Sequence, residues 1–172
     1  KIVNLFGGEP FLHKDIFEIL ELSLQLLDMD KRVIVNTNGT IFRQSSMKKL
    51  DNRIKFTISI DGSTEQQNRL MRGPDKFQGT LGIIEALVSN GNSVTINSVI
   101  NRYTWNDMRG ICDLGKRLGV SKINFLPHVF IDKSAAYVRD LIIPPEKRND
   151  FLREKRLIKE QYGKDFFSGK YI

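Results

Sequence analysis

The stretch IVNLFGGEP, residues 2–10, sets the pattern from which the fold can be predicted. Its apolar run from Ile2 to Phe6 is typical of a short strand, and Gly7-Gly8 marks the turn that ends it. Apolar residues then recur from Ile16 to Leu27 at helical spacing. The stretch and its continuation therefore predict a strand, a turn and a helix.

The same alternation of strand and helix continues along the chain. Further strands are predicted at residues 33–35, 55–60, 94–100 and 122–126. The helices between them are predicted through Met47 and Leu50, near residues 77–89 after a long polar loop, and from Trp105 to Leu118. Strands that are each separated by a helix are expected to run parallel, with right-handed crossovers. We therefore predict an α/β fold, in which about five parallel strands form a barrel or part of one, with the helices outside.

The chain departs from this alternation after about Asp132. Residues 144–146, Pro-Pro-Glu, are typical of a helix start, and a weak apolar face follows as far as Tyr162. The length of 172 residues predicts one domain rather than two. We therefore expect a partial barrel over residues 1–131, then a linker and an appended helix over residues 132–172.

The composition indicates a folded globular protein. Hydrophobic residues make up 40% and charged residues 27% of the chain, which excludes disorder as its main state. The net charge is +7, but the basic residues alternate with acids as on solvated helix faces, so we expect no nucleic-acid partner. No apolar run approaches the roughly 20 residues that span a bilayer, so we expect a cytoplasmic protein without a membrane partner.

The loop Gly7-Gly8-Glu9-Pro10 is the first place where chemistry can be expected. The two glycines let backbone approach a ligand, Glu9 adds a carboxylate, and Pro10 suits the first position of a helix. Backbone carbonyls and Glu9 together would accept hydrogen bonds from an ammonium group. A plain tight turn explains the same residues equally well, because Gly and Pro are common in loops.

Four motifs occur in an order that resembles the radical S-adenosylmethionine (SAM) superfamily. They are Gly7-Gly8-Glu9-Pro10, Asn36-Thr37-Asn38-Gly39, Ser59-Ile60-Asp61-Gly62 and Arg72-Gly73. The resemblance runs from residue 1 to about residue 127. It looks closest to the SPASM-type and anaerobic sulfatase-maturase-like branch, whose enzymes modify peptides and proteins. It implies a partial (β/α)6 radical SAM barrel.

The resemblance also implies a set of SAM-binding residues. The turn formed by Gly7, Gly8, Glu9 and Pro10 would hold the SAM amino group, and Thr37 and Asn38 would lie near the methionine part. Ser59 and Asp61 would bind the ribose hydroxyls or the carboxylate, and Arg72 would pair with the carboxylate. Backbone near residues 99–101 and 125–126 would bind adenine.

The arginine assignment has two candidates. Family members often carry His-Asp where this chain has Gln67-Asn68, and Arg69 competes with Arg72 for the matching position. Of the two histidines, His13 is expected at the surface. His128 follows the fifth predicted strand and is a candidate neighbour of SAM or substrate.

The [4Fe-4S] cluster of the family is held by three cysteines in a CxxxCxxC loop, which this chain lacks. Its one cysteine, Cys112, has helical spacing with Met108 and Trp105 and is expected to be a buried structural thiol. We therefore assign no metal ligand and no catalytic residue. The simplest interpretation is a fragment whose cluster ligands lie upstream, with an unpaired apolar edge at residues 2–6 that favours self-association.

For the parent enzyme, the resemblance implies that the reduced cluster cleaves SAM to a 5′-deoxyadenosyl radical, which abstracts hydrogen from a peptide or protein. Flavodoxin or ferredoxin would donate the electron. The chain alone is expected to be inactive. The alternative is that the chain is not an enzyme but a binding protein, a cluster-free SAM-binding or interaction module.

Overall fold

The computed structural model describes residues 2–26, 32–41, 50–74, 76–127 and 140–168. The strands are β1 (Ile2–Leu5), β2 (Arg32–Thr37), β3 (Lys55–Ser59), β4 (Val94–Ile100), β5 (Lys122–Pro127) and β6 (Phe167–Ser168). The α-helices are α1 (Ile16–Gln25), α2 (Glu65–Arg72), α3 (Phe77–Ser89), α4 (Met108–Leu118) and α6 (Arg148–Tyr162). Short 3₁₀ helices are η1 (Pro10–Leu12), η3 (Trp105–Asp107) and η4 (Pro145–Lys147).

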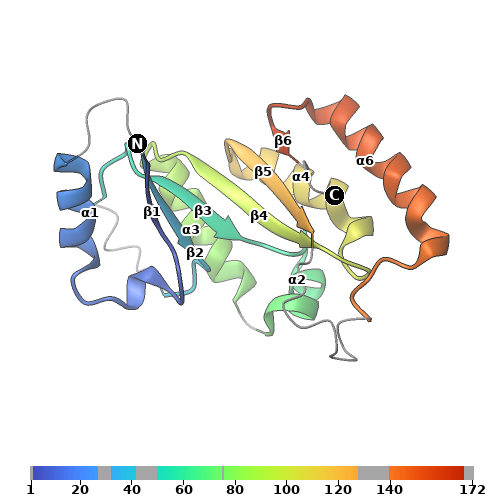
Figure 1. The fold of residues 1–172 in the computed structure, drawn as a ribbon, viewed down its shortest axis with the longest axis horizontal. Helices are drawn as coiled ribbons and strands as arrows, with labels where there is room; N and C mark the ends of the chain where they lie inside the picture. Colours follow the sequence, from blue (N-terminus) through green and yellow to red (C-terminus); the bar gives the residue numbers. More distant parts are fainter. Residues whose placement is uncertain (1, 27–31, 42–49, 75, 128–139, 169–172) are drawn as a thin grey trace.

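The six strands form one parallel sheet in the order of the sequence, β1 to β6 (Figure 1). The register sets Leu5 opposite Val35, and Ser59 opposite Asn97. Because parallel strands point the same way, the loops that follow β1, β2 and β3 leave the sheet at the same edge. The predicted α/β fold of parallel strands with helices is confirmed.

One face of the sheet is buried and apolar. In β3, Phe56 and Ile58 are buried and the residues beside them are half-buried, because successive side chains of a strand point to opposite faces. Helices α3 and α4 contribute to the same core and lie behind the strands in Figure 1. The opposite face carries polar side chains, and Asn124 Nδ2 donates there to Asn97 Oδ1 at 3.0 Å. The loops after β1, β2 and β3, which carry the candidate site residues, lie at the carboxyl edge of the sheet.

Several parts of the structure add to the sequence-based expectations. The polar loop after β3 contains α2, whose first turn is capped by the Thr64 side chain. The carboxyl-terminal segment contributes β6, parallel to β5, in addition to the predicted helix, which is α6. Of the helix predicted through Met47 and Leu50, the described residues include Leu50, which is not helical. Met47 and His128 lie outside the described residues. Among the helices that are described, none has the length and apolar character needed to cross a membrane.

β1 forms one end of the sheet, and β2 is its partner among the described strands. Apolar side chains are exposed along this edge: Ile2 is 63% and Phe6 is 74% exposed. An unpaired apolar strand edge can pair with another chain. Within the described residues the sheet is therefore open, as predicted, with its first strand accessible.

We expect the chain to self-associate through β1 as its concentration rises. An Ile2→Lys/Phe6→Lys variant should shift the mass measured by sedimentation equilibrium toward a single chain, because charged edge residues oppose strand pairing. A Leu152→Lys variant, which changes an exposed residue of α6, should leave association unchanged. A wild-type chain that stays monomeric at high concentration, or equal effects of the two variants, would contradict an edge interaction.

Candidate functional site

Two glycines in the left-handed backbone region shape the turn after β1. Gly7 has a φ of 96° and Gly8 a φ of 49°, where residues with a Cβ are strained. Glu9 follows as the N-cap of η1, and Pro10 takes the first position of that short helix. The turn therefore ends with a carboxylate at the carboxyl edge of the sheet.

The Glu9 carboxylate ties this turn to the end of β2. Glu9 is 9% exposed. Its Oε1 accepts hydrogen bonds from Thr37 Oγ1 at 2.6 Å and from the Phe11 N–H at 3.3 Å, and its Oε2 accepts the Asn38 N–H at 2.8 Å. A carboxylate has about four acceptor positions, so these partners leave capacity for a ligand donor. Glu9, Thr37 and Asn38, all predicted to bind SAM, thus form one hydrogen-bonded group.

The Asp61 carboxylate, after β3, is more deeply buried, with 3% of the residue exposed. Its Oδ1 accepts a hydrogen bond from the Val99 N–H at 2.7 Å. Its Oδ2 lies 2.8 Å from Arg72 Nε in an ion pair, and the Arg72 side chain is 28% exposed. Asp61 therefore joins the end of β3 to β4 and to the last residue of α2.

Asn68 of α2 supports Asp61, a role that the sequence analysis did not assign. Asn68 is buried, and its Oδ1 accepts the Asp61 backbone N–H at 3.0 Å. A Cβ on Gly62 would lie 2.3 Å from the Asn68 backbone nitrogen, so glycine is required where the loop passes α2. The available signal was the Gln67-Asn68 pair, which occupies the place of the family's His-Asp.

A polar pocket of about 160 Å³ lies where the ends of β2 and β3 approach α2 and α3. The residues that line it are Asn38, Thr40, Ser59, Asn68, Met71, Arg72, Lys76 and Thr80. Asn38, Ser59 and Arg72 belong to the predicted SAM-binding set. Lys76 adds a second cation, which the sequence analysis did not single out. Hydroxyl groups, amides and two cations together suit an anionic group such as a carboxylate.

The other predicted residues lie outside this pocket. Within the described chain, its lining does not include Gly7, Gly8, Glu9, Pro10, Thr37 or Asp61. Asn38 connects the two groups, because it lines the pocket and its N–H donates to Glu9. Arg69, the alternative to Arg72, is exposed on α2. The Val99 N–H, expected near adenine, donates to Asp61.

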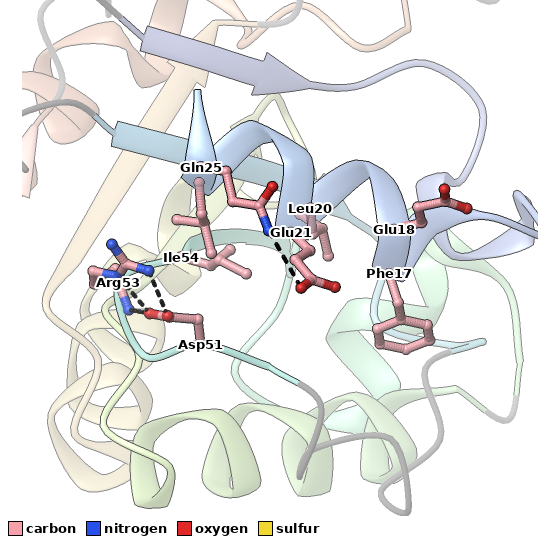
Figure 2. A pocket seen from close by; sticks show the side chains of 9 residues that line it. Phe17, Glu18, Leu20, Glu21, Gln25, Asp51, Arg53 and Ile54 are labelled. Atoms are coloured by element: carbon pink, nitrogen blue, oxygen red, sulfur yellow. Dashed lines mark hydrogen bonds and ion pairs between the residues drawn. The ribbon is translucent and has the colours of Figure 1, made fainter. Parts of the chain in front are cut away.

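A larger hollow of about 580 Å³ lies between α1 and the segment that leads into β3 (Figure 2). Apolar residues of α1 line it, and Asp51 and Arg53 form an ion pair at its side, with 2.8 Å between Asp51 Oδ2 and Arg53 Nη2. None of the predicted SAM-binding residues lines it. The polar pocket is therefore the candidate site.

Cys112 does not suit a cluster ligand. It is completely buried in α4, and this burial, together with the Asp113 carboxylate, raises the pKa of its thiol to about 12. Cluster ligands are thiolates. The described residues also hold no group of three or more His, Cys, Asp or Glu side chains placed to bind a metal. The prediction that Cys112 is a buried thiol is confirmed. The described residues do not fit a [4Fe-4S] cluster.

Comparison with known proteins places the chain in a family. Residues 1–115 match the model of the Radical SAM superfamily. The chain belongs to the radical SAM superfamily. Members of this superfamily use SAM and a [4Fe-4S] cluster, so the predicted family and its cofactors are confirmed at that level.

Two curated relatives of this radical SAM chain carry different names. An AdoMet-dependent heme synthase of Methanosarcina barkeri is 31% identical over 121 residues, which are 69% of this chain and 34% of the synthase. A probable GTP 3′,8-cyclase of Saccharolobus islandicus is 29% identical over 180 aligned positions, covering 99% of this chain and 54% of the cyclase. The chain thus spans about a third to about half of these relatives.

Several solved structures share the fold. SuiB of Streptococcus suis with S-adenosylmethionine bound has a TM-score of 0.72 over 98% of this chain and 38% of SuiB, at 17% identity. The protein anSMEcpe with AdoMet and a peptide bound has a TM-score of 0.75 over 99% of this chain and 50% of its own, at 20% identity. Sequence identities this low establish the fold and nothing further.

A Gly62→Ala variant should lower the free energy of unfolding by about 1–3 kcal/mol, because the added methyl group would overlap the Asn68 backbone. Urea unfolding measures the change. Gly82→Ala in α3 is the matched control: a Cβ there meets nothing within 4 Å, and alanine should stabilise the helix by up to about 1 kcal/mol. Equal stability of the two variants would contradict the close approach of the loop to α2.

We expect Cys112 of the folded chain to react slowly with thiol reagents at pH 8. The pKa of the thiol is raised to about 12, so the reactive thiolate is scarce, and the side chain is completely buried. Reaction with a chromogenic disulfide should be complete in urea and nearly absent without it. Rapid modification of the folded chain would contradict a structural role.

Proposed function

We propose that this chain is the SAM-binding portion of a radical SAM enzyme. The observation that carries the proposal is the arrangement around Asn38 at the carboxyl edge of the sheet. The buried acid Glu9 contacts Asn38 directly, and Arg72 lines the same pocket as Asn38. An acid and a cation in neighbouring positions are complementary to the ammonium and carboxylate groups of the methionine part of SAM.

The pocket has room for one end of SAM. Its volume of about 160 Å³ is smaller than the roughly 300–1,000 Å³ of pockets that enclose a whole ligand. We assign Arg72 to the carboxylate, because a guanidinium can form two parallel hydrogen bonds with it. Ser59 offers a hydroxyl to the ribose. Glu9 and the carbonyls of the two-glycine turn accept hydrogen bonds from the ammonium group.

In the whole enzyme, SAM and a [4Fe-4S] cluster held by other residues would supply a 5′-deoxyadenosyl radical. The described residues do not fit the cluster, so we assign the cleavage itself to none of them. Their role in the proposal is to bind SAM and fix its orientation, which lowers the entropic cost of reaction. A cluster-free SAM-binding module would use the same residues in the same way.

For the whole protein we propose modification of a peptide or protein, with a flavodoxin or ferredoxin as electron donor. The shared fold of SuiB with its precursor peptide and of anSMEcpe with a peptide supports this substrate class. A small-molecule substrate is the second candidate, because the names of the two relatives refer to heme and to GTP. Binding of GTP to the chain would favour this second candidate.

Calorimetry with SAM tests the proposed site. Glu9→Ala should weaken SAM binding about tenfold or more, because it removes a charge-assisted hydrogen bond to the ammonium group. Glu9→Gln should retain part of the affinity, since its amide oxygen can still accept the Asn38 N–H. Glu18→Ala makes the same change at an exposed position of α1 and should bind SAM like the wild type. Equal affinities of wild type and Glu9→Ala, or no binding by the wild type, would refute the site.

A further inference from the structure

Asp61 is buried among protein groups. Its side chain is 4% exposed, one oxygen accepts the Val99 N–H, and the other is paired with Arg72 Nε. Arg72 lines the polar pocket and Asp61 does not. We propose that Asp61 is a positioning residue, which holds the Arg72 guanidinium in the pocket so that it can bind a ligand carboxylate. This differs from the direct ligand contact expected from the sequence, and it rests on the proposed function.

Asp61 is itself firmly placed. The Val99 N–H of β4 donates to its carboxylate at 2.7 Å, and Asn68 of α2 accepts its backbone N–H at 3.0 Å. The backbone of Gly62 then packs against the Asn68 backbone so closely that a Cβ has no room. Contacts from β4 and α2 therefore fix the carboxylate before any ligand binds.

Arg72 needs such a contact to hold its side chain in place. Arg72 is the last residue of α2, and its long side chain has many rotamers when it is not held. Arg72 Nε lies 2.8 Å from Asp61 Oδ2 in an ion pair, although its N–H does not form a hydrogen bond there. The ion pair restricts the side chain, and the other N–H donors of the guanidinium can serve a ligand. A ligand carboxylate that meets a fixed guanidinium binds more tightly, because less side-chain entropy is lost on binding.

Asp61 has two opposing effects on a ligand carboxylate. The negative charge of Asp61 weakens the binding of a ligand carboxylate, whereas its ion pair with Arg72 strengthens that binding by orienting the guanidinium. Since Asp61 is buried and already paired with a cation, its field toward the pocket is largely cancelled, and the orienting effect should dominate. Removing the charge of Asp61 is therefore expected to weaken carboxylate binding.

The experiment compares two ligands on the full 172-residue chain by calorimetry. SAM has a carboxylate, whereas 5′-methylthioadenosine has the adenine and ribose without the amino-acid part. Asp61→Asn keeps an oxygen for the Val99 N–H and loses the ion pair. It should weaken SAM binding about tenfold and leave 5′-methylthioadenosine binding within about twofold. In an Arg72→Gln background, Asp61→Asn should cause little further loss.

Asp51→Asn is the matched control. Asp51 forms an ion pair with Arg53 at the same N···O distance of 2.8 Å, and this pair does not line the polar pocket (Figure 2). It should bind both ligands like the wild type. Thermal unfolding monitors the fold, and Asp61→Glu, which displaces the charge, replaces Asp61→Asn if the latter does not fold. For Asp61→Glu we expect the same losses of binding affinity as for Asp61→Asn.

Three results with a wild type that binds SAM would overturn the positioning role alone. Equal losses for the two ligands would mean that Asp61 contacts the ribose. Tighter SAM binding by Asp61→Asn would mean that Asp61 competes with the ligand for Arg72. Additive effects in the double variant would mean that the two residues act separately. A wild type that binds neither ligand would instead overturn the proposed function, and the positioning role with it.

Discussion

Two buried carboxylates, those of Glu9 and Asp61, organise the carboxyl edge of the sheet. A charge removed from water is costly unless protein groups replace its hydration. Glu9 accepts hydrogen bonds from Thr37 and Asn38 after β2. Asp61 accepts one from the Val99 N–H and forms an ion pair with Arg72. Each acid therefore connects the end of one strand to the element beside it. The loops at this edge take their shape from the need to satisfy these two groups.

The loop after β3 is fixed by further contacts of the same kind. Asp107 accepts hydrogen bonds from the Ser63 backbone N–H and from Ser63 Oγ, both at 2.6 Å. A Cβ on Gly110 would lie 2.5 Å from Asp107 Oδ1. Glycine at this position therefore lets the first turn of α4 come close to the Ser63–Asp107 pair. The loop is thus attached to α2 on one side and to η3, directly before α4, on the other. A site built on such a loop is organised before a ligand arrives.

The regular parts of this fold could be predicted from hydrophobic periodicity, and the exceptions have physical reasons. The helix predicted at residues 77–89 is α3, Phe77–Ser89, because its apolar residues recur at helical spacing. Helix α2 was missed because its single buried residue is Asn68, so its sequence has no apolar periodicity. Strand β6 was missed because two residues are too few to show any period.

The sequence motifs named Asn38, Ser59 and Arg72 among the residues that line the polar pocket, but not the contacts between the residues at this edge. The motifs named Asp61 and Arg72, and each was assigned to the ligand. Whether two charged side chains bind a ligand or each other depends on how the loop after β3 places α2. That placement depends on Asn68 and Gly62, whose roles appear only when β3 and α2 are seen together. Sequence motifs therefore point to part of such a site, and tertiary contacts decide how its residues pair.

The partners of the two acids also determine how charge is divided over the site. Glu9 is bonded to a hydroxyl and to two backbone N–H groups, all neutral, so its negative charge is available to a ligand cation. Asp61 is paired with Arg72, and this pair contributes little net charge. Lys76 leaves a positive charge in the lining of the pocket. In the proposed site, attraction of an ammonium would therefore depend on Glu9, whereas recognition of a carboxylate would depend on the charge of Lys76 and on the orientation of Arg72 beside Asp61.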